Sequence, residues 1–513
     1  MRLPTSAALP PAPAPRRPPA LRSAAAAFAA ALALHGPAAA QAPAGTPAPA
    51  APAPGAGHAP HGAQPAASPS GVPAASAAPA APGLTDGLPP QPAPCPATLP
   101  AGARCLGGRD AAGAFYWMAL PADWNQVLVV HAHGGPDLGA PTAARGQEDL
   151  RRWAVLVRAG YALAGSTYRR GGYGVTLAAE DTERVRALFV QYVGQPRRTI
   201  LHGQSYGGGV AAKAIDLHGP AEGRASPYDG ALITSGVLGG GVDAYAFRLD
   251  LRAVYQYVCR NHPGAQEPQY PLWMGLPAGA QMGREDLAAR VRDCTGIGLP
   301  VSERSPEQLA HLKTILDVVK IPERSLLSHL SWATFLFRDL TQHRLGGRNP
   351  FGNAGVAYRG SDDDEALNAG VPRYKADPEA VAALSADSRP SGRLGLPVLT
   401  LHAIHDPIAF VELEDAYRQI VAQAGSADRL VQVFTAESEH SYLSDPEYPA
   451  ALAALMAWID HGEKPTPQQV ARLCAGMAKR FPDGGCHVRP GFQPQPLAAR
   501  VPARAQAAAL SKK

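Results

Sequence analysis

The chain has 513 residues, of which 46% are hydrophobic and 17% charged, and its formal net charge at neutral pH is +5. Four arginines within the first 42 residues supply most of this excess, and without them the charge falls from +5 to +1. Such a near-neutral chain gives no reason to expect nucleic acid or a strongly acidic substrate as a partner.

Residues 1–42 have the features of a secretory signal peptide. Four arginines and no acid are followed by the apolar run Ala24–Leu34 and by the small residues Ala40–Ala42. The pair Arg16–Arg17 resembles a twin-arginine signal, but the two prolines after it disfavour that route. An apolar run of about 11 residues is too short for a transmembrane anchor. We therefore predict export to a secreted or periplasmic location, without a transmembrane segment.

Two terminal segments have the composition of disordered chain. Residues 43–93 are mostly Ala, Pro, Gly and Ser, which cannot bury enough apolar surface to offset the entropy of ordering. His58 and His61 in this segment are more typical of a solvated linker than of a metal site. Residues 496–513 are rich in Ala, Arg and Pro and are predicted to form a disordered tail.

The cysteines indicate disulfide bonds. An even number of cysteines in an exported chain is typical of a disulfide framework. Proximity in the sequence favours the pairs Cys95–Cys105, Cys259–Cys294 and Cys474–Cys486, although six cysteines allow other pairings. Their spacing does not match that of a zinc site, so we expect no metal.

From residue 94 onward, strands and helices alternate. This order predicts an α/β fold with a mostly parallel sheet covered by helices on both faces. The predicted strands are 115–120, 127–131, 161–167, 199–202 and 230–234, and the predicted helices are 145–159 and 178–193.

The alternation stops near residue 239 and resumes near residue 394. The segment between them contains the predicted helices 242–257, 284–293, 306–319 and 325–341. After it come the predicted strands 397–401 and 430–434 and the helices 411–424 and 450–461. We therefore divide the folded chain into a core of 94–238 and 394–495, interrupted by a helical cap of 239–393.

Residues Gly203–Gly207 read Gly-Gln-Ser-Tyr-Gly and directly follow the predicted strand 199–202. This is the nucleophile-elbow pattern, in which a serine occupies a strained turn between a strand and a helix. The small residues around Ser205 leave room for the strand and the helix to approach one another. Ser205 is the predicted nucleophile, and a glycine-rich turn with an incidental serine is the alternative.

A nucleophilic serine needs a histidine base oriented by a carboxylate. In the elbow topology the chain order is serine, acid, histidine. Asp406 follows one predicted strand and His440 follows the next, so both leave the carboxyl edge of the sheet where Ser205 emerges. The rival acids are Glu437 and Glu439, and the rival bases are His402 and His405.

The oxyanion formed during attack needs preorganised backbone N–H groups. The residue after the nucleophile, Tyr206, supplies one. The sequence His133-Gly134-Gly135 follows the buried strand 127–131 and is predicted to supply another, from Gly135 first and from Gly134 as the second choice. A Gly-Gly-Pro turn without this role is the alternative.

These motifs resemble those of α/β-hydrolase-fold serine hydrolases over approximately 110–240 and 395–462. The resemblance implies the α/β-hydrolase fold, with an eight-stranded, mostly parallel sheet and a cap inserted between nucleophile and acid. Bacterial tannases and feruloyl esterases are similar in having a large lid there. The Gly-x-Ser-Tyr-Gly-Gly form also resembles that of secreted proline-type aminopeptidases.

The cap offers two further features. Its aromatic residues line a substrate pocket or form the core of the cap; they are Tyr255, Tyr257, Tyr270, Trp273, Trp332, Phe335 and Phe337. The acidic run Asp362–Glu365 lacks the pattern of a calcium loop and is more typical of a solvated helix start capped by Ser361. No phosphate-binding glycine loop is present in the sequence, so no cofactor is implied.

Three functions are compatible with these features. The first is an exported serine hydrolase that cleaves a small-molecule or polymeric carboxylic ester through an acyl-enzyme. The second is an aminopeptidase-like serine peptidase of the same fold, in which Asp362–Glu365 binds the substrate amine. The third is a non-catalytic binding module, against which the complete Ser/Asp/His set argues.

Overall fold

The computed structural model describes residues 83–86, 88–220, 225–502 and 504. The predicted signal peptide and most of the predicted linker lie outside these residues. Within the residues described, every helix is too short or too polar to cross a membrane.

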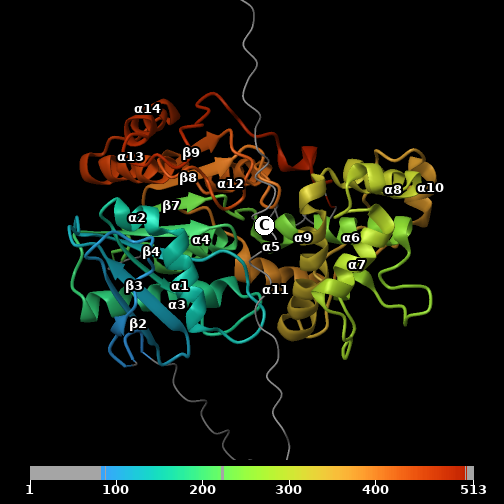
Figure 1. The fold of residues 1–513 in the computed structure, drawn as a ribbon, viewed down its shortest axis with the longest axis horizontal. Helices are drawn as coiled ribbons and strands as arrows, with labels where there is room; N and C mark the ends of the chain where they lie inside the picture. The colour runs from blue at the N-terminus through green and yellow to red at the C-terminus, as the bar shows by residue number, and fades with distance from the viewer. Residues whose placement is uncertain (1–82, 87, 221–224, 503, 505–513) are drawn as a thin grey trace, which may run out of the picture. The chain divides into compact units, whose positions relative to one another are not determined.

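A nine-stranded sheet forms the centre of the core, in the order β1-β2-β3-β5-β4-β6-β7-β8-β9 (Figure 1). The pairs β1–β2, β2–β3 and β3–β5 are antiparallel, whereas all pairs from β5 through β4 to β9 are parallel. The strands are β1 (Gln91–Ala93), β2 (Arg104–Arg109), β3 (Phe115–Leu120), β4 (Val127–Ala132), β5 (Ala162–Ser166), β6 (Arg198–Gln204), β7 (Gly230–Thr234), β8 (Val398–Ala403) and β9 (Leu430–Thr435).

Helices cover both faces of this sheet. On β4, Leu128 and Val130 belong to the hydrophobic cluster shared with α3 and α4, whereas Val127 and Val129 belong to the cluster shared with α2 and α13. This alternation follows from the two-residue period of a strand. The helices of the core are α1 (Ala143–Arg152), α2 (Ala154–Arg158), α3 (Val175–Tyr192), α4 (Tyr206–His218), α12 (Glu412–Gln423), α13 (Glu447–His461) and α14 (Pro467–Met477).

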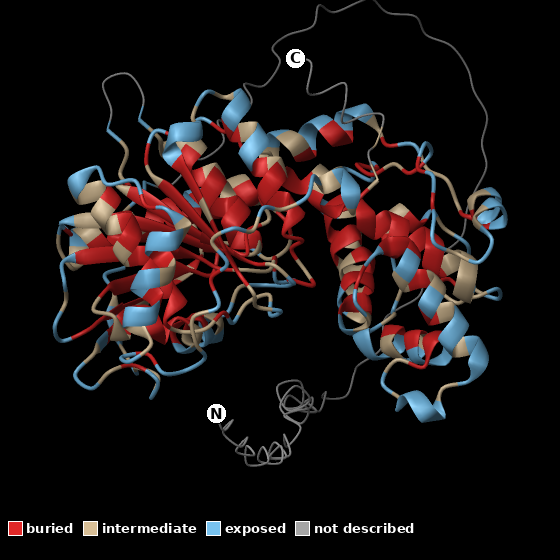
Figure 2. Ribbon diagram, turned by 90° about the horizontal axis from the view of Figure 1, so that it is seen from above, coloured by how far each residue is buried: buried red, intermediate tan, exposed pale blue. Residues whose placement is uncertain are grey.

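The cap has a hydrophobic cluster of its own, which includes Leu251, Val254, Ile315 and Leu330. Figure 2 shows this second group of buried residues beside the buried strands and helices of the core. The helices between β7 and β8 are α5 (Gly240–Tyr245), α6 (Phe247–Cys259), η1 (Leu272–Met274), α7 (Arg284–Thr295), η2 (Val301–Glu303), α8 (Pro306–Val319), η3 (Glu323–Ser325), α9 (Leu326–Ser331), the π-helices η4 (Trp332–Leu336) and η5 (Asp339–Arg344), α10 (Asp364–Gly370) and α11 (Pro378–Ser388).

Helix α11 lies within the range predicted for the cap but packs on the core. The backbone N–H groups of Val175 and Thr176, which begin α3, donate to the Asp387 carboxylate at 2.9 and 3.0 Å. The buried Leu384 belongs to the same hydrophobic cluster as α3 and α4. The chain therefore returns to the core before residue 393.

Several predicted boundaries were wrong. The sheet has nine strands rather than eight. Strand β1 lies inside the predicted linker and pairs with β2, whose Gly107 and Gly108 weaken its strand pattern. The predicted tail contains η7 (Leu497–Ala499), and the Arg500 guanidinium pairs with Glu412 at 3.0 Å.

Two predicted helices are interrupted. The segment 145–159 divides at Trp153 into α1 and α2, and the segment 325–341 is α9 followed by π-helical turns. Apolar periodicity does not distinguish α-helical from π-helical turns over so few residues. The first hairpin of the sheet, β1–β2, and helix α14 were not predicted.

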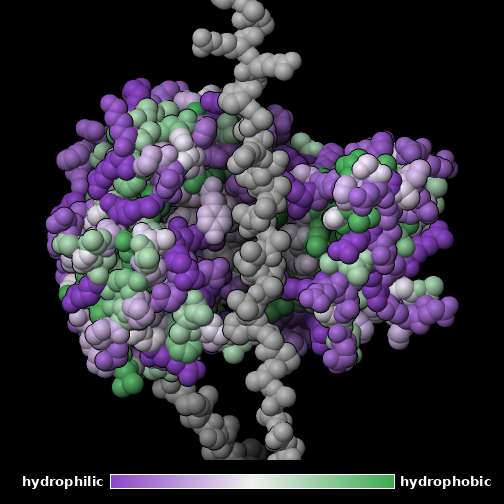
Figure 3. All heavy atoms as spheres, in the orientation of Figure 1, coloured by the Kyte–Doolittle hydropathy of each residue, from purple (hydrophilic) through white to green (hydrophobic). Residues whose placement is uncertain are grey.

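The three disulfide bonds are those predicted from sequence proximity, namely Cys95–Cys105, Cys259–Cys294 and Cys474–Cys486. The second lies in the cap, and the third joins α14 to the loop after it. Hydrophilic residues predominate on the face of the core and cap in Figure 3, with smaller hydrophobic areas between them.

Candidate active site

Ser205 occupies a strained turn between β6 and α4, with φ 58° and ψ −123°. Hydrogen bonds on both sides hold this conformation. The Ser205 N–H donates to the Thr234 carbonyl at 3.1 Å, and the Ser205 carbonyl accepts from the N–H groups of Gly208 and Val237 at 2.9 Å. Backbone strain of this kind costs about 1–3 kcal/mol and persists where the surroundings over-determine it.

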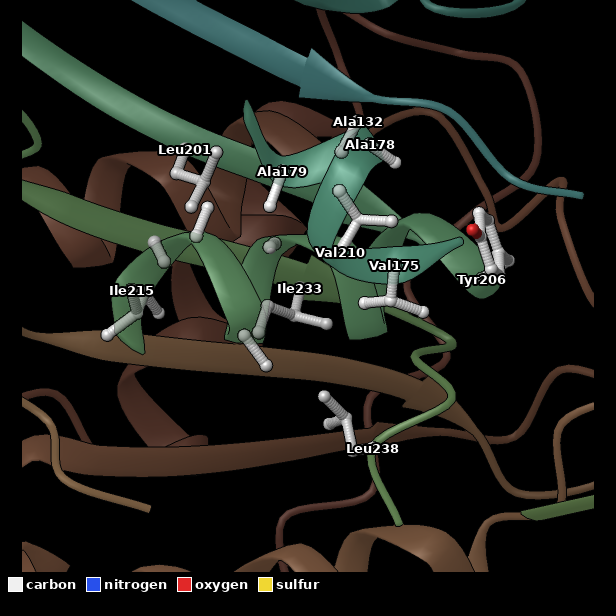
Figure 4. Packing of buried hydrophobic residues seen from close by; sticks show 14 of the residues in the cluster. Ala132, Val175, Ala178, Ala179, Leu201, Tyr206, Val210, Ile215, Ile233 and Leu238 are labelled. Carbon is white, nitrogen blue, oxygen red and sulfur yellow. The ribbon is translucent and has the colours of Figure 1, made fainter. Parts of the chain in front are cut away.

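The glycines of the elbow are needed for close approach. A Cβ on Gly203 would lie 2.2 Å from the Gly207 carbonyl oxygen, and a Cβ on Gly207 would lie 2.0 Å from the Ala132 carbonyl oxygen. Figure 4 shows how closely α4 then packs, with Val210 near Ala132 and the small side chains of α3. The local sequence therefore lets the helix start directly against the sheet.

The structure brings Ser205, His440 and Asp406 together. The Ser205 Oγ lies 2.7 Å from His440 Nε2. On the other side of the ring, His440 Nδ1 lies 2.8 Å from Asp406 Oδ2 and 3.0 Å from Oδ1. Ser205 follows β6, Asp406 follows β8 and His440 follows β9, so all three are at the carboxyl edge of the sheet.

Asp406 is buried but strongly stabilised as a carboxylate. Its Oδ1 accepts from the backbone N–H groups of Ile408 and Ala409 at 2.8 and 3.0 Å. Burial alone would raise its pKa, but the neighbouring His440 and His402 hold the pKa of Asp406 well below its usual range. The acid is therefore charged at neutral pH and can orient the histidine.

The rival acids have other partners. The Glu437 carboxylate accepts from the Ser444 backbone N–H at 3.2 Å and from its hydroxyl. The Glu439 carboxylate pairs with Arg324 at 3.1 Å. Neither carboxylate has a described hydrogen bond or ion pair with His440.

The rival bases also lie apart from the nucleophile. His405 is exposed, with no described contact to Ser205. His402 is fully buried, between Glu414 (3.0 Å to Nδ1) and the Ala409 carbonyl (2.8 Å to Nε2). Its Nε2 is also 3.6 Å from Asp406 Oδ2. The interpretation of His402 as a packed histidine missed this contact, because sequence does not show what lies behind the acid.

The loop after β4 lies against the elbow. A Cβ on Gly134 would lie 2.4 Å from Gln204 Oε1 and 3.1 Å from the Ser205 Cβ. Gly135 has φ +74°, a conformation that glycine adopts without strain. Among the described residues, no acceptor is found for the backbone N–H groups of Tyr206, Gly134 or Gly135.

Two side chains fix the peptides of this loop. The Tyr168 hydroxyl donates to the His133 carbonyl at 3.0 Å, and Arg145 Nη2 donates to the Gly134 carbonyl at 2.9 Å. In a trans peptide the carbonyl and the next N–H point in opposite directions. These bonds therefore set the directions of the Gly134 and Gly135 N–H groups. The sequence analysis did not predict either side chain.

The histidine loop is held from two directions. Gln204 Nε2, from the elbow itself, donates to the His440 carbonyl at 3.2 Å and to the Ser441 hydroxyl at 3.0 Å. From the cap, Arg324 Nη2 donates to the Ser438 and His405 carbonyls, the latter at 3.4 Å. Arg324 thus joins the loop that carries the acid to the loop that carries the base.

Only some of the predicted pocket aromatics are on the surface of the cap. Tyr255 and Phe337 are fully buried in hydrophobic clusters, whereas Trp332 is partly exposed at the start of the π-helix η4. Its ring stacks on Tyr245 at 4.2 Å and lies 6.4 Å from the ring of Tyr173. Tyr173 in turn is 5.5 Å from Tyr206, the residue after the nucleophile. This row of rings therefore connects the cap to the elbow.

The acidic run in the cap is a helix start. Asp363, rather than Ser361, is the N-cap of α10 and accepts from the Ala366 N–H at 2.9 Å. The Ser361 hydroxyl instead donates to Asp364 at 2.6 Å. Figure 1 places α10 at the end of the cap far from the sheet and from α4, the helix that follows Ser205. Across the described residues, no group of three His, Cys, Asp or Glu side chains is arranged to hold a metal.

These features define an α/β-hydrolase fold. They are the strand order, the parallel run from β5 to β9, the strained serine after β6 and the cap between β7 and β8. No protein-family model and no curated protein sequence matches the chain.

Among solved structures, the chain is similar to a rice cell wall degrading esterase, LipA, from Xanthomonas oryzae, at 13% identity over 74% of this chain and 90% of that one, with a TM-score of 0.33. It is also similar to an esterase from Aspergillus oryzae, at 14% identity over 71% and 80% of the two chains, with a TM-score of 0.37. A puromycin hydrolase matches at 16% identity over 72% of this chain and 39% of that one, with a TM-score of 0.33. Such low values carry no information on activity or substrate.

Proposed function

We propose that the protein is an exported serine hydrolase that cleaves carboxylic esters. The observation that carries this proposal is the chain of contacts from Ser205 Oγ through the ring of His440 to Asp406, at 2.7 and 2.8 Å. Three disulfide bonds support an oxidising location outside the cytoplasm.

The reaction proceeds through an acyl-enzyme. Ser205 Oγ attacks the ester carbonyl while His440 Nε2 takes its proton, and the backbone N–H groups of Tyr206 and Gly135 or Gly134 stabilise the oxyanion. His440 then gives the proton to the departing alcohol. A water molecule, activated by the same histidine, hydrolyses the acyl-enzyme and restores Ser205.

An ester substrate fits better than a peptide bearing a free amine. Recognition of a substrate amine needs a carboxylate near the nucleophile. The candidate run Asp362–Glu365 is at the far end of the cap and partly engaged in starting α10. Asp406 is already bonded to His440, and Glu439, the residue before His440 in the chain, pairs with Arg324.

A substrate panel tests the proposal. We expect the wild-type protein to hydrolyse short-chain p-nitrophenyl esters and to leave aminoacyl-p-nitroanilides largely uncleaved. Ser205→Ala should lower kcat/KM for the esters by at least about 10⁴-fold, because the covalent route is lost. Faster cleavage of the anilides would favour the peptidase, and full activity of Ser205→Ala would exclude the proposed nucleophile.

A further inference from the structure

Arg248 is a buried cation in the cap without a protein partner. It lies on α6, its exposed fraction is 3%, and it makes no hydrogen bond or ion pair with any described residue. The other fully buried arginines of the described chain are partnered. Arg184 pairs with Asp110, and Arg252 donates to the His262 carbonyl at 3.0 Å.

The guanidinium N–H groups of Arg248 are unsatisfied. Its Nε and Nη1 are sealed from solvent without an acceptor, whereas Nη2 is not sealed in this way. Burying a charged donor without an acceptor is costly unless a partner completes it. Burial lowers the pKa of Arg248 to about 10, and no carboxylate acts on it, so the group is still a cation at neutral pH.

Aromatic rings surround this cation. The Arg248 Cζ lies 4.6 Å from the ring centre of Trp332 and 4.8 Å from those of Tyr245 and Phe247. Such contacts stabilise a buried cation but do not take up its N–H groups as an oxygen acceptor would. The cation is therefore flanked by aromatic rings and has no oxygen acceptor among the described residues.

Two chains of contacts link this cation to the candidate active site. Trp332 leads through Tyr173 to Tyr206, which follows the nucleophile. On the other side, the Phe247 ring lies 5.0 Å from that of His329.

His329 Nε2 donates to the carbonyl of Pro407, the residue after Asp406, at 2.9 Å. Burial is the largest cause that lowers the pKa of His329. Arg248 and His440 lower this pKa further, whereas Asp406 raises it. Arg248 and the triad are therefore both within electrostatic reach of this one histidine.

We propose that Arg248 binds a carboxylate of the substrate, so that the ester this protein cleaves carries a free carboxylate on its acyl or its alcohol part. This inference rests on the proposed ester hydrolysis and names its substrate class. Arginine is suited to the role because its Nη2, which is not sealed from solvent, can donate a charge-assisted hydrogen bond to a carboxylate. The aromatic rings around the guanidinium lower the local dielectric and strengthen that pairing.

Two matched ester pairs test this directly. Monomethyl glutarate is compared with the methyl ester of glutaramic acid, and the acetyl ester of 4-hydroxybenzoic acid with that of 4-hydroxybenzamide. Each pair differs only in a carboxylate against a neutral amide, on the acyl side in the first and on the alcohol side in the second. We expect a kcat/KM roughly 10- to 100-fold higher for the carboxylate in at least one pair, as a charge-assisted hydrogen bond predicts.

Variants locate that preference. Arg248→Met should remove the preference while changing kcat/KM for the amide ester by less than about threefold, and Arg248→Lys should restore part of it. The control is Arg338→Met, which removes an arginine from the open groove of about 720 Å³ that Arg109, Arg170 and Arg344 also line. A preference that survives Arg248→Met but is lost in Arg338→Met would overturn the proposal.

A measurement on the wild type covers the case in which Arg248→Met does not fold. Glutarate should inhibit hydrolysis of the amide esters competitively, and glutaramide should inhibit far more weakly. Equal inhibition by both, or amide and carboxylate esters cleaved equally well, would overturn this inference and leave the proposed function standing. Absence of any ester hydrolysis by folded protein would instead overturn the proposed function, and this inference with it.

Discussion

His402 is a residue behind the triad that, together with His440, stabilises the charge of the acid. Its ring lies between Glu414 and Asp406 and is fully buried. Burial opposes its charge, but the two carboxylates raise the pKa of His402 to about 10. We interpret it as a cation that stabilises the Asp406 carboxylate, and therefore as a positioning residue.

From the buried ion cluster of His402, Asp406 and Glu414 we predict that the free energy of unfolding depends on pH. The folded protein keeps the His402 proton between its ordinary pKa near 6.5 and about 10, whereas the unfolded chain has released it. The contribution to the free energy of unfolding is therefore complete below about pH 6.5 and is lost as the pH rises toward 10.

His402→Gln should accordingly be destabilised by roughly 3–5 kcal/mol at pH 6, as expected when one partner of a buried ion pair is removed. The difference from wild type should shrink between pH 7 and pH 10. Chemical denaturation of both proteins across this range measures it. A difference that stays constant with pH would show that His402 carries no charge in the fold.

At the residue scale, much of the site was predictable. Ser205, Asp406 and His440 follow from a motif, a chain order and three strand ends, because sheet topology brings such ends to one edge. The contacts of His402, Tyr168 and Arg145 were not predictable. They depend on which side chains pack behind the site, and no local pattern records that.

At the scale of elements, the loop after β4 depends on its glycines for a close approach to the elbow. A methyl group on Gly134 would lie 2.4 Å from Gln204 Oε1 and 3.1 Å from the Ser205 Cβ, so the Gln204 side chain or the loop must shift to admit it. A shift of the loop displaces the proposed oxyanion donor, and loss of one such donor typically costs 10²- to 10³-fold in kcat.

We therefore expect Gly134→Ala to lower kcat for p-nitrophenyl esters by about 10²-fold, with a smaller change in KM. Gly355→Ala is the matched control, because a Cβ at Gly355 meets no atom within 4 Å and its φ is not positive. Steady-state kinetics of the two variants measures the contrast. Near-normal kcat in Gly134→Ala would remove this loop from the oxyanion site.

The elements themselves were predicted unevenly. The buried strand β4 and the helix α8 were predicted nearly as they are, because each has a clear apolar pattern and α8 begins with a capping box at Ser305. The β1–β2 hairpin was missed because β1 has only three residues, one of them Pro, and β2 contains two adjacent Gly. The π-helical turns after α9 were missed because they share the apolar spacing of a helix.

At the scale of the whole described chain, the fold places Ser205, Asp406 and His440 on one edge of the sheet and inserts the cap between Ser205 and Asp406 in the chain. Nothing in the sequence indicated that the cap also holds the catalytic loops. In the structure Arg324 of the cap bonds both loops, and Arg248 of the cap approaches the triad through Phe247 and His329. The cap therefore contributes contacts to the candidate site.

Intact-mass analysis after reaction with a fluorophosphonate probe tests the central claim most directly. We expect one adduct on the wild-type protein, no adduct on Ser205→Ala, and labelling slowed by roughly 10⁴-fold in Asp406→Asn, in which the base is misoriented. Folded wild-type protein that takes no adduct, or Ser205→Ala that is labelled at the wild-type rate, would contradict the assignment of Ser205 as an activated nucleophile.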